Sequence, residues 1–331
     1  MPLAAMNDLP KLPPGVLPSV LGAIGATPLV DLRRLTADLE GHIYAKLEYM
    51  SPGHSKKDRI GLAIIEAAEN RGELAPGQTV VEMTSGNTGT GVAIVCAVKG
   101  YRFVAVMSEG NSSERVRMMQ ALGAEVVLVD QAAGGRCGLV RGDDLSLVED
   151  AARKIAQSRD AFLVDQFVRC ENALAHERGT AQEILQQTGG SFDAFCDFAG
   201  TGGSFAGCTK AFKEVAESIR CYLVEPAGAE VLAGGVPPYA EHPIQGGGYS
   251  RELPLIDKTL VDGFLSVTGA DARHWAHRLA SEEGIFGGFS SGANVAAAVH
   301  LLAGEVAGGS IVTMICDSGL KYLSTDLWGK D

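Results

Sequence analysis

The sequence lacks three features, and each absence argues against a class of protein. No apolar run approaches the roughly 18 residues of a membrane-spanning helix, and residues 1–20 carry neither the basic nor the apolar region of a signal peptide. The seven cysteines form no C-x-x-C pair, so free thiols in a cytoplasmic protein fit better than a zinc site, and we expect no metal. Lys and Arg total 28 against 40 Asp and Glu, a net charge of −12, which argues against nucleic acid and anionic membrane as partners.

The sequence does contain a regular alternation of short apolar runs and amphipathic segments. The apolar runs predict strands at 27–32, 43–49, 79–83, 103–107, 125–129, 192–198, 220–224, 260–267 and 310–315. Helices are predicted between them, at 58–70, 87–99, 112–122, 143–158, 171–187, 205–218, 271–283 and 292–302. The glycine- and proline-rich segment 226–254 is too long for an ordinary connection and is a candidate functional loop. Because this alternation is typical of largely parallel sheets covered by helices on both faces, the sequence predicts an α/β fold.

Two adjacent lysines stand between a predicted strand and a predicted helix. Pro52 and Gly53 break the strand and Ser55 can cap the helix, so Lys56 and Lys57 fall in its first turn. A lysine that is partly buried there, with the helix dipole against it, loses its proton more easily than a free lysine and can form a Schiff base with a carbonyl. From this stretch alone, two solvated lysines on the first turn of a helix are the favoured interpretation.

Two glycine-rich loops lie where a predicted strand passes into a predicted helix, the place where such folds bind ligands. Thr84–Gly89 offers small polar side chains and backbone N–H groups at a helix start, which suits a carboxylate. Gly200–Ser204 allows close backbone approach and adds two hydroxyls, which suits a phosphate. Neither loop matches the patterns for nucleoside triphosphates or dinucleotides, and each alone can be a structural turn. Together with a reactive lysine, they meet the needs of pyridoxal phosphate and its amino-acid substrate.

Eight motifs follow one another in order along the chain. They are Ile24–Leu29, Ala45–Glu48, Pro52–Arg59, Thr84–Gly89, Gly200–Gly203, Val224–Pro226, Gly288–Gly292 and Asp317–Thr325. In this order they resemble the cysteine synthase and cystathionine β-synthase family of fold type II pyridoxal-phosphate enzymes. The resemblance implies two three-layer α/β/α domains with mostly parallel sheets, as in the tryptophan synthase β chain. It also implies a homodimer.

The domain division that the resemblance implies has two parts. Residues 1–45 and 160–331 would form a larger domain that binds the cofactor phosphate. Residues 46–159 would form a smaller, mobile domain with the substrate-carboxylate loop, and the active site would lie in the cleft between the two.

The resemblance further implies roles for individual residues. Lys57 occupies the lysine position of the family pattern Ser-x-Lys-Asp-Arg and would form the Schiff base, whereas Lys56 occupies the variable position. The implied cofactor-binding residues are Asn87 at the phenolate oxygen, Gly200, Thr201, Gly202, Gly203 and Ser204 at the phosphate, and Ser290 at the pyridine nitrogen. The implied substrate-binding residues are Thr84, Ser85, Gly86 and Thr88 at the carboxylate, with Gln166 beside the active site. His176 would have a structural role.

The implied reaction is β-replacement on an O-activated serine, such as O-acetylserine with sulfide or another small nucleophile. Lys57 would act as general base, and the reaction would pass through an aminoacrylate intermediate. One alternative is a β-eliminating lyase or ammonia-lyase that acts on a polar or acidic β-substituted amino acid. A more distant one is a non-catalytic binding protein of the same fold. Thr88 favours replacement, because fold type II dehydratases typically carry a histidine at this position.

Four residues depart from the family pattern in loops that line the substrate pocket of the family. They are His54, Asn111, Tyr249 and Arg251. These side chains are bulkier or more polar than those of the family, so we expect them to contact the substrate and to change which amino acid is accepted. The charge of Arg251 could pair with an acidic group of the substrate.

Overall fold

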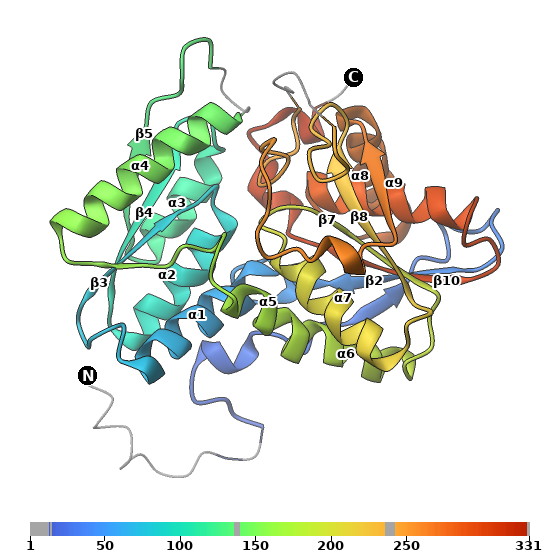
Figure 1. The fold of residues 1–331 in the computed structure, drawn as a ribbon, viewed down its shortest axis with the longest axis horizontal. Coiled ribbons are helices and arrows are strands. Elements are labelled where there is room, and N and C mark those ends of the chain that lie inside the picture. Colours follow the sequence, from blue (N-terminus) through green and yellow to red (C-terminus); the bar gives the residue numbers. More distant parts are fainter. Residues whose placement is uncertain (1–12, 14, 136–139, 236–241, 330–331) are drawn as a thin grey trace.

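The strands of the computed structural model, which describes residues 13, 15–135, 140–235 and 242–329, form two separate sheets (Figure 1). The first has six strands in the order β1 (Leu29–Asp31), β2 (His42–Leu47), β10 (Ser310–Ile315), β7 (Ala194–Phe198), β8 (Arg220–Pro226) and β9 (Gly263–Val267). The second has four, in the order β5 (Glu125–Val129), β4 (Arg102–Ser108), β3 (Thr79–Met83) and β6 (Phe162–Leu163). All neighbouring strands are parallel except β1 and β2, which confirms the predicted α/β fold with mostly parallel sheets.

Helices accompany both sheets. Around the four-stranded sheet, in the left half of Figure 1, lie α1 (Lys57–Arg71), α2 (Asn87–Lys99), α3 (Ser113–Ala121) and α4 (Gly142–Ser158). Around the six-stranded sheet lie α5 (Glu171–Ala175), α6 (Ala181–Thr188), α7 (Gly203–Val215), α8 (Gly269–Glu283) and α9 (Phe289–Leu302). Short 3₁₀ turns occur at Val20–Ala23, Glu48–Met50, Lys258–Leu260, Gly319–Tyr322 and Asp326–Trp328. Because α1 packs on both α2 and α5, it joins the two halves.

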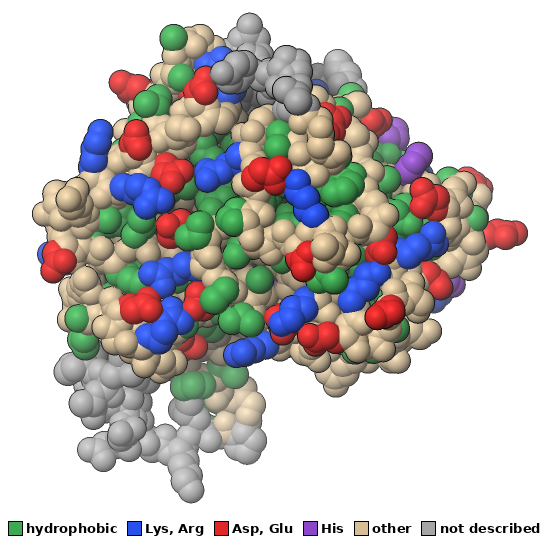
Figure 2. Space-filling view, viewed as in Figure 1, with side chains coloured by type: hydrophobic (Ala, Val, Ile, Leu, Met, Phe, Trp, Pro, Cys, Tyr) green, Lys and Arg blue, Asp and Glu red, His purple; other side chains and the backbone are tan. Residues whose placement is uncertain are grey.

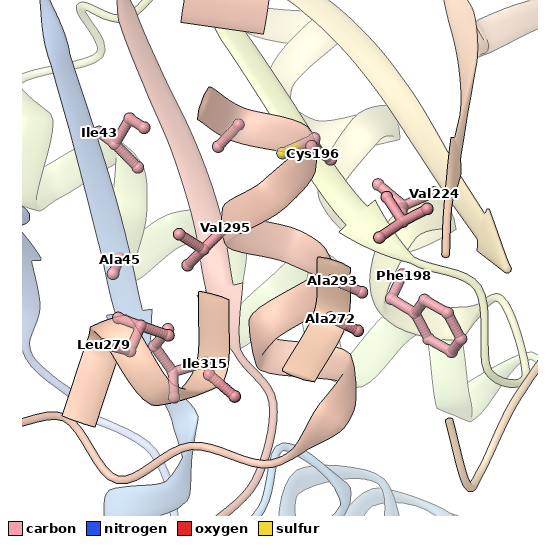
Figure 3. Packing of buried hydrophobic residues seen from close by; sticks show 14 of the residues in the cluster. Ile43, Ala45, Cys196, Phe198, Val224, Ala272, Leu279, Ala293, Val295 and Ile315 are labelled. Atoms are coloured by element: carbon pink, nitrogen blue, oxygen red, sulfur yellow. The ribbon is translucent and has the colours of Figure 1, made fainter. Parts of the chain in front are cut away.

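The central strands are buried because helices cover both of their faces. Every residue of β3 and of β7 is buried, as expected for parallel strands in the middle of a layered fold. Figure 3 shows Ile43 and Ala45 of β2 near Val295 of α9 in one such core layer. The helices α8 and α9 approach closely at Gly292, where an added Cβ would lie 1.9 Å from the carbonyl oxygen of Ala272. This dense packing gives the ligand loops a rigid base.

The sequence prediction and the structure differ at three places. The helix predicted at 171–187 is interrupted by a π turn at His176–Thr180, which separates α5 from α6. The two-residue strand β6 was not predicted, because two residues are too few to show a periodicity. Ser55 is not the N-cap of α1, which is Lys56; the Ser55 hydroxyl instead accepts the Lys57 amide at 3.3 Å.

The predicted domain boundaries both fall close to paired strands. The boundary after residue 45 lies inside β2, which runs to Leu47 in the six-stranded sheet. The boundary at residue 160 places β6 with the larger domain, although β6 pairs with β3 of the four-stranded sheet. The domain division and the mobility of the smaller domain stay predictions. Most of the N-terminal arm, Cys137 and part of the 226–254 segment lie outside the described residues.

Among the described residues, no helix is long and apolar enough to cross a membrane. The same part of the chain holds no cluster of three or more His, Cys, Asp or Glu residues suited to a metal ion, and its six cysteines are free thiols. On the face shown in Figure 2, basic and acidic side chains are interspersed and do not gather into a patch of one sign.

Candidate active site

A pocket lies between the two sheets, at the carboxyl ends of β3 and β7. Its walls come from both halves of the molecule: Lys57, Met83, Thr84, Ser85, Asn87, Thr88, Arg115, Leu145, Gln166, Phe167, Thr201, Gly246 and Tyr249. Ligands of open parallel sheets bind beyond the carboxyl ends of the strands, because the loops there lead into helix N-termini. The pocket brings together Lys57, four residues of the loop Thr84–Gly89, and Thr201 of the loop Gly200–Ser204.

Lys57 lies at the wall of this pocket, and its amine has a lowered pKa. Its side chain is buried at the first turn of α1, and its Nζ lies 3.2 Å from the Thr201 hydroxyl. Burial first, and then the neighbouring Lys56 ammonium, lower the pKa of Lys57 to about 7. Asn172 also donates to the Thr201 hydroxyl, at 2.8 Å, which holds this contact in place. A lysine in this state can attack a carbonyl near neutral pH.

The loop Thr84–Gly89 forms the opposite wall and is held by its own side chains. The Thr84 hydroxyl accepts the amides of Gly86 and Gly89, each at 2.9 Å, and Gly86 is the N-cap of α2. The Ser85 hydroxyl lies 2.6 Å from the Tyr249 hydroxyl, which comes from the other half of the molecule. This wall presents hydroxyls and the start of a helix to the pocket, an arrangement that suits an anion.

Three further side chains of the pocket are oriented by neighbours outside the loop. The Thr88 hydroxyl donates to Gln166 at 2.5 Å, and Gln166 donates to the Met83 carbonyl at 3.0 Å. Asn87 accepts from Lys321 at 2.7 Å and donates to Asp317 at 2.8 Å, so the orientation of its amide is determined by charged partners.

The loop Gly200–Ser204 leads from β7 into α7. Gly202 is the N-cap of α7 and has a φ of +85°, the left-handed region that favours glycine. At Gly203 an added Cβ would lie 1.9 Å from Oδ1 of Asn172, so only glycine fits there. The bare backbone at a helix N-terminus can receive a phosphate. Pyridoxal phosphate needs an amine for its aldehyde, a site for its phosphate and a site for the substrate carboxylate. The lysine amine and the two polar loops around this pocket fit these needs.

Comparisons with known proteins agree with this geometry. Residues 20–317 match the family described as "Pyridoxal-phosphate dependent enzyme". The chain belongs to this family. A cysteine synthase from Staphylococcus aureus is 38% identical over 309 residues, covering 93% of this chain and 96% of the relative.

Solved structures of the pyridoxal-phosphate family superpose closely on the chain. An O-ureido-L-serine synthase is 36% identical, with a TM-score of 0.87 and 96% coverage of both chains. A hydrogen sulfide-producing enzyme from Fusobacterium nucleatum is 38% identical, with a TM-score of 0.85 and coverage of 93% of this chain and 100% of that one. This enzyme therefore uses pyridoxal phosphate, as the sequence predicted, and the family confirms the resemblance.

Of the four unusual residues, the structure of this pyridoxal-phosphate enzyme brings only Tyr249 into the pocket. The His54 side chain is exposed, on a backbone with a φ of +58°. Asn111 is buried but donates to the Ser108 carbonyl away from the pocket lining. Arg251 lies in a neighbouring hollow, pairs with Glu149 at 3.3 Å and stacks on the Phe167 ring.

Ser290 and Ser204, both expected at the cofactor, are not among the residues that line the pocket. Ser290 is buried and interacts with the Cys316 thiol. The Ser204 hydroxyl donates to Asp197 at 2.5 Å and accepts from Lys56 at 2.8 Å. His176 is fully buried, and its Nδ1 lies 2.8 Å from the Thr180 hydroxyl in the π turn.

Sequence reasoning missed Arg115, which lines the same pocket. Its side chain is 1% exposed, its Nη1 donates to the Ser85 carbonyl at 2.7 Å, and its guanidinium lies over the Tyr322 ring. No local pattern distinguishes this arginine from the solvated ones of an amphipathic helix. Its burial depends on Tyr322, which lies more than 200 residues later in the chain.

Proposed function

We propose that this enzyme catalyses β-replacement on an O-activated serine, with sulfide or another small nucleophile taking the place of the oxygen-linked group. The observation that carries the proposal is the buried Lys57 amine in one pocket with the Thr84–Gly89 loop and Thr201 of the phosphate loop. Relatives named cysteine synthase and O-ureido-L-serine synthase, both at 36% identity or more, support a serine-derived substrate.

The roles of the residues follow from their positions. Pyridoxal phosphate supplies an electron sink for negative charge at the Cα of a bound amino acid. Burial and the Lys56 ammonium lower the pKa of Lys57 to about 7, so that it can accept the Cα proton as general base. The N-terminal end of α2, with Thr84, Ser85, Gly86 and Thr88, holds the carboxylate. Gly200–Ser204 would hold the phosphate of the cofactor, Asn87 its phenolate oxygen, and Gln166 and Tyr249 would border the substrate. Ser290 would lie at the pyridine nitrogen, and because a serine is no acid it would not protonate that nitrogen, which suits loss of a group from Cβ.

The test compares substrates and nucleophiles with one purified protein. O-acetylserine, O-phosphoserine and cysteine are each incubated with and without sulfide, and new amino acids and pyruvate are quantified. We expect a new amino acid that requires the nucleophile, and little pyruvate. The Lys57→Ala variant should lose this activity together with the visible absorbance of the lysine-bound cofactor. Lys154→Ala, at an exposed lysine of α4, should keep both.

Two outcomes would contradict the proposal. Pyruvate formed regardless of the nucleophile, with no new amino acid, would make the enzyme a β-eliminating lyase. Absence of cofactor absorbance in the native protein would favour a binding protein of the same fold.

We further propose that the enzyme is a cytoplasmic homodimer. Val16, Leu17 and Val20 of the N-terminal segment are 51%, 54% and 44% exposed, an apolar group that a second copy of the chain would cover. Light scattering should report twice the mass of the chain, and a monomer would contradict the proposal. Replacing the three residues with serine should shift the equilibrium toward the monomer.

A further inference from the structure

A second buried lysine lies directly before Lys57 and is held by a carboxylate of the six-stranded sheet. The Lys56 Nζ lies 2.9 and 2.8 Å from the two carboxylate oxygens of Asp197, and 2.8 Å from the Ser204 hydroxyl. The Lys56 side chain is 8% exposed and that of Asp197 is 0% exposed. Asn294 of α9 also donates to Asp197, at 3.0 Å.

An ion pair at such a place is not required to stabilise a fold. The desolvation of two buried charges offsets most of their attraction, and apolar residues of similar volume often serve stability equally well. The pair joins three parts of the site: the turn that carries Lys57, the end of β7, and Ser204 in the first turn of α7. The one proton of the Ser204 hydroxyl is donated to Asp197, so its oxygen is left to accept from Lys56.

We propose that Lys56 and Asp197 form a positioning pair for the cofactor lysine, in which Asp197 holds the Lys56 ammonium beside Lys57 and fixes the start of α7 against the lysine-bearing turn. The proposal rests on the function proposed above, because it concerns the lysine that receives the cofactor. Neither residue is expected to touch the substrate.

The charges that surround Lys57 single out this pair. Burial raises the pKa of Glu82 to about 8 and that of the Cys316 thiol to about 12, so both are uncharged at neutral pH. Burial, with the nearby lysines, lowers the pKa of His176 well below its ordinary value, so this imidazole is neutral too. Burial also lowers the pKa of Lys56, but the facing Asp197 more than offsets this and leaves it above the ordinary value. Besides burial, four side chains have the largest effects on the pKa of Lys57, and of these only Lys56 and Asp197 form an ion pair.

The two members of the pair act on Lys57 with opposite sign. The Lys56 cation disfavours a proton on Lys57, and the Asp197 anion favours one. Removal of Lys56 alone should therefore raise the pKa of Lys57, and removal of the Asp197 charge alone should lower it. Loosening of the structure by either change would act differently, since hydration of the site would raise the pKa of Lys57 in both variants.

The experiment measures the reactivity of Lys57 in the full-length chain after the cofactor has been removed. Trinitrobenzenesulfonate modifies neutral amines, and peptide mass spectrometry reports the rate at Lys57 as a function of pH. We expect Lys56→Met to raise the midpoint by about one pH unit and Asp197→Asn to lower it by about one unit. Lys56→Arg, which keeps the charge, and the exposed control Lys154→Met should keep the wild-type midpoint.

The double variant Lys56→Met/Asp197→Asn protects the test from a folding failure, because it leaves no unpaired buried charge. Its midpoint should lie between those of the two single variants. The proposal is overturned if both single variants shift in the same direction, or if neither shifts. The assay uses no substrate, so failure of the β-replacement proposal would leave these midpoints as they are.

Discussion

Tyr249 is the one of the four unusual residues, His54, Asn111, Tyr249 and Arg251, that lines the pocket. It is buried, its hydroxyl lies 2.6 Å from that of Ser85, and it also borders the hollow that contains Arg251. A phenol ring in this place reduces the room beside the carboxylate loop. We therefore propose that Tyr249 limits the size of the β-substituent; His54 and Arg251 are not among the residues that line this pocket.

A change of size at Tyr249 should alter substrate preference. Tyr249→Ala should raise kcat/KM for serine derivatives with bulky O-substituents relative to O-acetylserine by about tenfold, because a pocket of altered size shifts selectivity by about 1–3 kcal/mol. Tyr249→Phe keeps the ring, loses the hydrogen bond to Ser85, and should keep the preference for the smaller substrate. Competition assays with paired substrates measure the ratio. An unchanged ratio in Tyr249→Ala would place the size limit elsewhere.

At the scale of elements, the strand β3 is fully buried and contains the carboxyl group of Glu82. Burial, and then the neighbouring Asp165, raise the pKa of Glu82 to about 8, while its Oε2 accepts the Asp165 amide at 2.9 Å. The folded protein thus holds a proton on Glu82 that the unfolded chain releases near pH 4.5. Between these two values the folded state binds more protons, so the free energy of unfolding falls as the pH rises.

Glu82→Gln should remove this pH dependence, because an amide has nothing to titrate. Relative to the wild type, the variant should gain stability between about pH 5 and about pH 8, by on the order of a few kcal/mol. Urea unfolding at the two pH values measures the difference. Glu217→Gln, at an exposed carboxylate, serves as the control and should change nothing. A constant difference between Glu82→Gln and wild type at both pH values would show that Glu82 is ionised in the folded state.

At the scale of the whole molecule, a buried charge network around Arg59 joins segments from three parts of the chain. Its guanidinium donates to both oxygens of Glu48, at 2.7 and 2.9 Å, and to both oxygens of Glu183, at 2.7 and 2.8 Å. Glu48 follows β2, Arg59 belongs to α1 and Glu183 to α6. The network therefore connects the helix that carries Lys57 to the larger sheet and its helices.

Arg59→Ala should destabilise the protein by about 3–5 kcal/mol, since it leaves the fully buried Glu48 carboxylate without its partner. Arg159→Ala is the matched control: this arginine also binds a carboxylate with two contacts, at 2.6 and 2.7 Å, but both partners are exposed. Its loss should change stability by less than about 1 kcal/mol. Chemical denaturation of both variants measures the contrast, and equal losses would show that burial does not matter here.

Local pattern determined the elements and the chemistry that this protein can carry. The strand at Thr79–Met83 and the helix at Asn87–Lys99 have the predicted bounds. These bounds depend on apolar runs and on the glycines that end them, which are properties of neighbouring residues. The helical segment predicted at 171–187 is present, but it contains a π turn at His176–Thr180 for which the sequence has no local signal. The family and its cofactor were also readable, because ordered motifs are a property of the sequence.

Only the tertiary structure decided which side chains share the pocket and what charge they carry. Asp197 lies 141 residues from Lys56, and Tyr249 lies 164 residues from Ser85, so neither contact can be read from a local pattern. His54 stands three residues before Lys57 and yet points to solvent, while the distant Arg115 and Gly246 line the site. The pKa of Lys57 depends on burial and on the charge of its neighbours. Both are set by the packing of segments that are far apart in the sequence.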